Sequence, residues 1–314
     1  MQTGRYFAIS VMSVLCCHAV IASNFVISPM SESQIQGAIF IDSLSVPSPG
    51  EVFAAMNKVC RPNWATLVLP ISAPVSTERS QLALAVGVLS ANGYIAVEAQ
   101  DGQQVKNVGR EMMSVAKSLG ISESLMGRGN SLIQFADNSD WEALAGELEA
   151  TENEVKATMV GQKDKELVTL TSAAAWLRGL QVVTTVILAS PTLQGAEVID
   201  QSSLARHLLL QLDALPIRVR KSERVITVHD SLDQIAAILE KRNKLPDSSL
   251  GKKRIEIQKI HQLAAGAVQA IMTSASAPSQ IPSIPPIPMP RIPGVPEVHG
   301  VSNNSPAVIT PSKP

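Results

Sequence analysis

Residues 164–188 read DKELVTLTSAAAWLRGLQVVTTVIL, and this stretch decides the fold. After Val168 it is almost uniformly apolar, with Arg178, Gln181 and a few hydroxyl residues as the interruptions. A helix that is apolar on all sides is typical of the buried centre of a protein. A membrane span is the competing interpretation, but the charged and polar residues interrupt a run that is already short. We therefore predict a buried central helix here.

A second apolar helix is predicted over about residues 77–100, with a kink at Asn92-Gly93 as one alternative. Small residues recur on it every four positions, at Ala83, Gly87 and Ala91. Such a row of small side chains lets a neighbouring backbone approach closely. We expect this helix and the helix over 164–188 to pack together as a buried central pair.

Amphipathic helices are predicted around this pair, and several have clear end signals. Ser48-Pro49-Gly50-Glu51 forms a capping box with Pro at the first helical position. Ser122 is a predicted N-cap, as is Ser139 or Asp140, and Gly120 is a predicted C-terminal stop. The helices are expected over about 48–59, 101–119, 122–137, 140–159, 196–215, 217–242 with a break at Asp230, and 249–273.

The helix over 140–159 has an apolar stripe formed by Trp141, Leu144, Leu148, Val155 and Met159. Glu152 and Lys156 are predicted to form an i,i+4 ion pair on its outer face. Such a pair contributes about 0.2–0.5 kcal/mol to an exposed helix. We interpret it as a feature for solubility and local support.

Composition limits the fold class and the partners. Of 314 residues 45% are hydrophobic but only 3% are aromatic, which favours packed helices over an aromatic-rich β-sandwich. A formal net charge of −1 gives no basic field for a phosphate backbone, so no nucleic acid is expected as the main ligand. The predicted fold is all-α, an irregular multi-helix bundle with a buried central helical pair.

The N-terminus has the order of a secretory signal peptide. Arg5 precedes an apolar run and then small residues, and cleavage is predicted after Ala22. The prediction is therefore a signal peptide over 1–22, followed by an extended leader over 23–47. An uncleaved anchor and a lipoprotein modified at Cys17 are the less favoured alternatives. We expect an exported protein, either secreted or in the periplasm and cell envelope.

The helical domain is predicted over 48–273 and a disordered, proline-rich tail over 274–314. Eleven of the chain's 20 prolines lie in this tail, which favours an extended polyproline II conformation. It is either a spacer or docking peptide, or a solvated tail with no specific partner, and the second interpretation is slightly favoured.

Residues that commonly carry chemistry are sparse. Cleavage would leave Cys60 as the single cysteine, which is interpreted as a small hydrophobic residue. His207, His229, His261 and His299 lack metal-ligand spacing. Serine-nucleophile and phosphate-loop motifs are also missing from the sequence, so no catalytic residue, metal or cofactor is predicted.

One polar cluster is predicted on the helices expected to be buried: Glu98, Asp101, Arg110 and Arg178. Glu98 and Asp101 are three residues apart and share a helix face, so a carboxylate pair for acid–base chemistry or cation binding is one hypothesis. The favoured alternative is structural, with Arg178 neutralising one of the two carboxylates.

Three functions follow from these patterns. The leading hypothesis is a non-enzymatic binding or scaffold protein that contacts a protein or another envelope component. The first alternative is a small-molecule or lipid carrier with a pocket between the apolar helices around 82–97 and 168–187. The second is a hydrolase-like enzyme that uses the Glu/Asp/Arg cluster. The sequence predicts neither the ligand nor the oligomeric state.

Overall fold

The computed structural model describes residues 46–69, 72–242 and 250–274. All of them belong to one compact unit. The described residues form helices and connecting loops without a β-strand, which confirms the all-α prediction. The predicted signal peptide, residues 23–45 of the predicted leader and the tail from residue 275 lie outside the described residues.

The predicted central pair consists of α3 (Arg79–Glu98) and α7 (Lys165–Ala189), which make the most extensive helix–helix contact in the described structure. The Thr171 hydroxyl of α7 donates a hydrogen bond to the Ala83 carbonyl of α3 at 3.0 Å. A Cβ atom at Gly87 would lie only 2.1 Å from the Thr171 carbonyl oxygen, so the backbones do approach at the predicted small residues. α3 continues through Asn92-Gly93 as a single helix.

Both central helices are long and apolar enough to cross a membrane. In their most apolar 18-residue windows, however, 94% of α3 and 72% of α7 is buried inside the protein. Core helices have this property because other helices cover their apolar surface. The high burial of both windows agrees with the prediction that α3 and α7 form a buried central pair.

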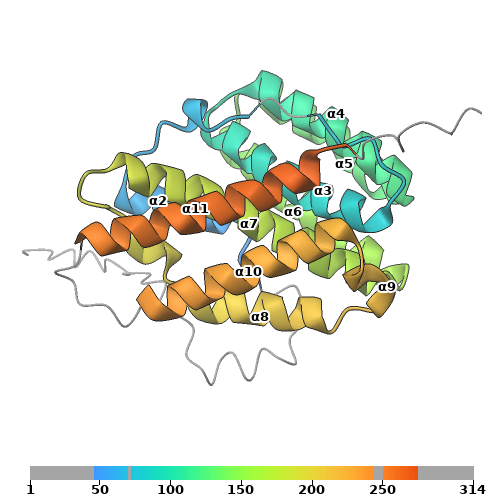
Figure 1. The fold of residues 1–314 in the computed structure, drawn as a ribbon. Coiled ribbons are helices and arrows are strands. Elements are labelled where there is room, and N and C mark those ends of the chain that lie inside the picture. Colours follow the sequence, from blue (N-terminus) through green and yellow to red (C-terminus); the bar gives the residue numbers. More distant parts are fainter. Residues whose placement is uncertain (1–45, 70–71, 243–249, 275–314) are drawn as a thin grey trace, which may run out of the picture. The chain divides into compact units, whose positions relative to one another are not determined.

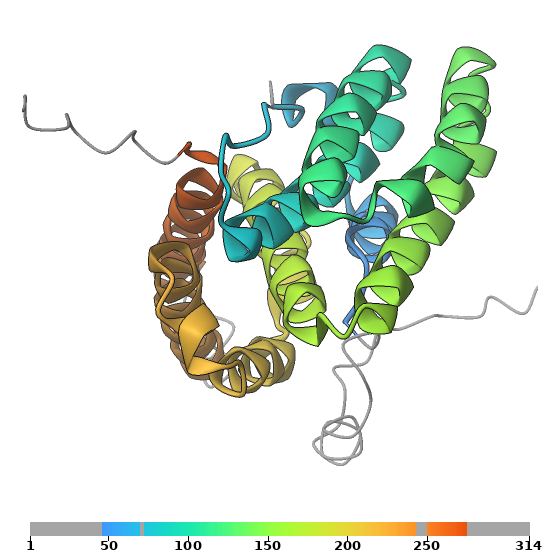
Figure 2. The same cartoon turned by 90° about the vertical axis from the view of Figure 1, so that its right-hand side faces the viewer.

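Helices cover the central pair on two opposite sides (Figures 1 and 2). One side carries α4 (Gly102–Leu119), α5 (Ser122–Asp137) and α6 (Trp141–Gly161). The other carries α8 (Ser202–Asp213), α10 (Glu223–Arg242) and α11 (Leu250–Met272), which lie one beside the next. α2 (Pro49–Val59) also packs on α3 and α7. This two-sided cover explains why α3 and α7 lack a polar face.

Three short elements complete the described structure. They are the 3₁₀ turns η2 (Trp64–Thr66) and η3 (Ala196–Ile199), and the one-turn helix α9 (Ile217–Arg220). The Trp64 ring of η2 packs against Phe53 of α2 with ring centroids 5.0 Å apart.

Most helix ends form as their sequence signals predict. The Ser48 hydroxyl accepts from the Glu51 amide at 3.2 Å, and the Glu51 carboxylate accepts from the Ser48 amide at 2.8 Å, which completes the capping box of α2. Asp101 caps α4 by accepting from the Gln104 amide at 3.0 Å. Gly120 ends α4 in the left-handed conformation, with φ of 77°.

Three local predictions are wrong. Asp140 does cap α6, but Ser122 is the first residue of α5 and Ile121 is the N-cap. The predicted break at Asp230 lies instead at residues 221–222, between α9 and α10, so Asp230 is inside a continuous helix. The helix expected over 196–215 is divided into η3 and α8. These boundaries depend on the packing of successive short helices, which outweighs local propensity.

The apolar core has two parts. The larger cluster extends through α3, α7 and the helices on both sides of them. A small second cluster connects α3, α4, α5 and α6, and it consists of Ala96, Val97, Val105, Ala136 and Leu144. The second cluster fixes α4, α5 and α6 against the C-terminal end of α3, and the candidate site lies among these four helices.

Candidate functional site

A cavity of about 290 Å³ lies among α3, α4, α5 and α6. Thr171 is the one lining residue from α7. This cavity does not lie between α3 and α7, the helices expected to enclose a carrier pocket, since the two pack closely at Gly87. Most of the lining is aliphatic or thioether side chains: Val86, Leu89, Val105, Val108, Met112, Met113, Leu132, Ile133, Leu144, Leu148 and Val155.

Glycines help to keep this cavity open. Gly109 of α4 and Gly129 of α5 both line it, and a Cβ atom at either position would meet no other group within 4 Å. Gly129 shares a helix face with the lining residues Leu132 and Ile133, three and four positions further on. A larger side chain at Gly129 would thus be placed on the face that lines the cavity.

The mouth of the cavity lies between α4 and α5. Its most exposed lining residues are Gly109 and Arg110 of α4 and Ile133 of α5, a residue that is 47% exposed. Lys106, one turn before Arg110, also lines this region and pairs with Asp137 at 2.7 Å. The entrance therefore combines an exposed apolar side chain with two cations.

The inner wall of the cavity includes a buried ion pair between two residues of α6. Lys156 Nζ lies 2.8 Å from Glu152 Oε1, and the two side chains are only 7% and 8% exposed. The Ser90 hydroxyl of α3 donates to Glu152 Oε2 at 3.1 Å. The prediction that this pair lies on the outer face of its helix is wrong, because α6 turns the pair toward α3 and the cavity.

The sequence did contain a signal for this position. The apolar stripe of α6 steps from Leu148 to Val155, and Glu152 stands four residues after the first and three before the second. Residues at this spacing lie on one helix face. Glu152 thus occupies a place in the stripe itself, and Lys156 follows it by one turn.

Tyr94 lies near the same carboxylate. Burial, followed by the negative charges of Glu152 and Glu149, raises the pKa of the Tyr94 phenol well above its ordinary value of 10. The phenol is therefore neutral at physiological pH. Tyr94 therefore adds no charge beside the Glu152–Lys156 ion pair.

The predicted polar cluster does not form as a connected group. Within the described part of the chain, no hydrogen bond or ion pair joins any two of its four members. Glu98 accepts from Asn57 Nδ2 at 2.7 Å, and Asp101 is the cap of α4. Arg110 donates to Asn107 and lines the mouth of the cavity.

Arg178, the fourth member, is buried in α7 without the predicted carboxylate. Its Nε donates to Asn92 Oδ1 at 3.0 Å, and its two terminal nitrogens donate to Gln181 Oε1 at 2.9 Å and the Leu67 carbonyl at 3.0 Å. Burial lowers the pKa of Arg178 to about 10. Its contacts join α3, α7 and the loop after α2, which is a structural role.

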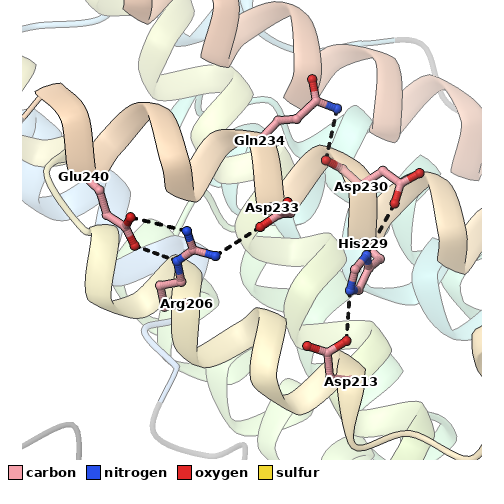
Figure 3. A network of polar contacts seen from close by, with 7 residues as sticks. All are labelled: Arg206, Asp213, His229, Asp230, Asp233, Gln234 and Glu240. Carbon is pink, nitrogen blue, oxygen red and sulfur yellow. Dashed lines mark hydrogen bonds and ion pairs between the residues drawn. The ribbon is translucent and has the colours of Figure 1, made fainter.

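Figure 3 shows a second polar network, between α8 and α10. Arg206 contacts Glu240 and Asp233, the latter at 3.0 Å, and His229 Nε2 lies 3.0 Å from Asp213 Oδ1. The charged side chains in it are more than a third exposed or close to it. Exposed pairs of this kind contribute little to stability, and we interpret them as links between neighbouring helices.

Metal-ligating and nucleophilic groups are poorly placed. Within the described ranges, no group of three His, Cys, Asp or Glu side chains could hold a metal ion. The Cys60 thiol donates to the Met56 carbonyl at 3.5 Å. Burial and the charge of Glu197 raise the pKa of Cys60, which keeps the thiol protonated and weakly nucleophilic.

No family model, curated protein or solved structure matches this chain. The functional argument therefore depends on the geometry of the cavity and its charged wall.

Proposed function

We propose that the helical unit binds a small, largely apolar ligand in the cavity among α3, α4, α5 and α6, as a carrier or ligand-binding protein. The observation that carries the proposal is the cavity of about 290 Å³ with a mostly apolar lining and a few polar groups. Ligand sites in proteins are concave and mostly apolar, with volumes from about 300 Å³ upward, and helical bundles hold ligands between their helices.

An empty apolar cavity lowers the stability of a fold, and this supports the same proposal. Protein interiors are close-packed, and an unfilled apolar cavity weakens a fold because its lining loses packing contacts. Here the helices of the central pair reach backbone contact, whereas glycines at the cavity leave space open. A ligand that fills this space would restore the missing contacts.

The proposal is tested by titrating the purified chain with N-phenyl-1-naphthylamine, an uncharged probe whose fluorescence rises in apolar surroundings. We expect saturable binding by the wild type and at least tenfold weaker binding by Gly129→Leu. Gly127→Leu is the matched control, because Gly127 lies on the same helix, is exposed and does not line the cavity. Leu is the better helix former at both positions, so both variants should fold.

Absence of saturable probe binding by the wild type would refute the proposal. Equal effects of Gly129→Leu and Gly127→Leu would also count against it, because the probe would then bind elsewhere. Circular dichroism of each variant confirms that its helical content is unchanged before binding is compared.

Export is a further part of the proposal, and the sequence over residues 1–22 supports it. The chain would then act outside the cytoplasm, in the cell envelope or as a secreted protein. Intact mass of the native product tests this: a chain that begins at Ser23 supports export with cleavage, and an acylated Cys17 supports a tethered lipoprotein. A soluble product that retains residue 1 would refute export. A scaffold role with a protein partner stays a prediction.

A further inference from the structure

The Lys156 ammonium is a buried group with unused hydrogen-bonding capacity. An ammonium has three N–H donors, and within the described residues Lys156 contacts one acceptor, Glu152 Oε1 at 2.8 Å. The side chain is 7% exposed and lines the cavity. Burial of a charged donor is unfavourable unless acceptors replace water. Two donors of this cation therefore have no protein acceptor among the described residues.

The carboxylate of the pair is more fully engaged. Glu152 Oε1 contacts Lys156, and Oε2 accepts from the Ser90 hydroxyl at 3.1 Å. The inner wall thus has spare donors on its cation, while both oxygens of its anion already have partners. This asymmetry favours an acceptor group on the ligand.

The charges around the cavity favour an anionic acceptor. Lys106, Arg110 and Lys156 line it, and Glu152 is the one carboxylate among its lining residues. Lys106 is offset by Asp137, whereas Arg110 contacts the neutral Asn107. An excess of positive charge along the entry path attracts an anion and lowers the free energy of its bound state. The Glu152 carboxylate repels a second anion, but it is one negative group among three cationic lining residues.

From these contacts we propose that the cavity binds a long-chain monocarboxylate, such as a fatty acid, with its carboxylate accepting hydrogen bonds from Lys156 Nζ. The alkyl chain occupies the apolar lining. Charge-assisted hydrogen bonds of this kind are stronger than neutral ones, so the head group adds selectivity to the apolar contact. This inference rests on the proposed function, because it needs the cavity to take up an apolar ligand.

The test is displacement of N-phenyl-1-naphthylamine from the full chain by three ligands of equal chain length, each kept below its micellar concentration. Dodecanoate, 1-dodecanol and dodecylamine differ in their head groups alone. We expect dodecanoate to displace the probe from the wild type at a concentration at least tenfold lower than dodecanol does. Dodecylamine should be the weakest competitor.

Variants assign this preference to the inner wall. In the double variant Glu152→Gln/Lys156→Met, the ratio of the dodecanol to the dodecanoate concentration should fall to about one. Lys117→Met is the control, because Lys117 is an exposed lysine of α4 that does not line the cavity, and it should keep the wild-type ratio. Glu152→Gln alone should raise the ratio, since the opposing carboxylate is gone. If neither variant folds, the wild-type ratio by itself tests the inference.

The outcomes separate this inference from the proposed function. Probe binding without a preference for dodecanoate would overturn the monocarboxylate and leave the cavity as an apolar site. A preference that persists in the double variant would overturn the role of Lys156. Preference for dodecylamine would assign the head-group contact to Glu152 and also overturn the inference. Failure of the wild type to bind the probe would overturn both proposals together.

Discussion

The close contact between α3 and α7 makes Gly87→Ala the sharpest test of the fold. A Cβ atom at this position would lie 2.1 Å from the Thr171 carbonyl oxygen and 2.8 Å from the Ala175 nitrogen. Both are backbone atoms of α7, so rotation of a side chain cannot relieve the clash. The two helices must move apart by roughly 1 Å, a gap at which about a quarter to a half of each dispersion contact is lost.

The size of the effect follows from three contributions. Overpacking in a core costs about 1–3 kcal/mol. Separation of the helices also strains the hydrogen bond from Thr171 to Ala83, which is worth about 1 kcal/mol. Replacing Gly by Ala in a helix contributes about 1 kcal/mol in the opposite direction. We expect a net loss of about 2 kcal/mol in the free energy of unfolding.

Urea and thermal unfolding followed by circular dichroism measure this loss. A change of about 2 kcal/mol corresponds to a fall in Tm of about 4–8 °C for a domain of this size. Gly179→Ala is the matched control, because Gly179 is buried in α7 but a Cβ atom there would meet nothing within 4 Å. It should raise stability by about 0.5–1 kcal/mol. Gly87→Ala with a stability equal to that of Gly179→Ala would refute the close contact.

Three further predictions concern stability and pH. Lys156→Met alone should lower the free energy of unfolding by about 3–5 kcal/mol, because it leaves Glu152 buried without its cation. The double variant Glu152→Gln/Lys156→Met should lower it much less, and a double-mutant cycle of urea unfolding measures the difference. Burial lowers the pKa of His207 below its ordinary value of 6.5, so the folded state binds its proton less readily than the unfolded state. The contribution of His207 to the free energy of unfolding is present above pH 6.5 and is lost as the pH falls through the lowered pKa. His207→Gln should therefore flatten this part of the pH profile of Tm. An unchanged profile would contradict the assignment to His207. Ser48→Ala should lower the free energy of unfolding by about 1 kcal/mol, because α2 loses its capping box, and calorimetry that finds no change would show that the cap is not limiting.

The central pair and the caps were predictable because their signals are local. The residues from 168 to 188 are almost uniformly apolar, and Gly87 stands in a row of small residues, so the sequence itself contains the information for a buried close contact. The Ser48 capping box and the Gly120 stop involve residues within one or two turns of each other. None of these features depends on how distant helices are arranged.

The partners of Arg178 could not be predicted in the same way. Glu98 and Asp101 were the expected anions, but Asn92 is the α3 residue that contacts Arg178. Six residues separate Asn92 from Glu98, which is about 240° around a helix, so the two side chains point in different directions. The rotation of α3 about its own axis decides which of them meets α7, and that rotation is set by packing on both sides of the pair.

The position of the observed cavity was not predicted, for a related reason. The sequence predicted a pocket between the two most apolar helices, but apolar surfaces with small side chains pack most closely and leave the least space. Space remains instead beside α4 and α5, where Gly109 and Gly129 contribute no side chain. A ligand site among helices is therefore better sought where the apolar packing is incomplete than where the helices are most apolar.

Two of the buried cations, Arg178 and Lys156, show why an incomplete set of partners indicates a ligand more strongly than burial does. Each nitrogen of the Arg178 guanidinium donates to a protein acceptor, so this cation is accommodated by the fold. Lys156 is as deeply buried, yet one of its three donors has a protein partner within the described residues, and the side chain lines an apolar space. A cavity and a buried ion pair each destabilise a core, and here the ion pair lines the cavity. Departures from good packing that coincide in this way are typical of a functional site.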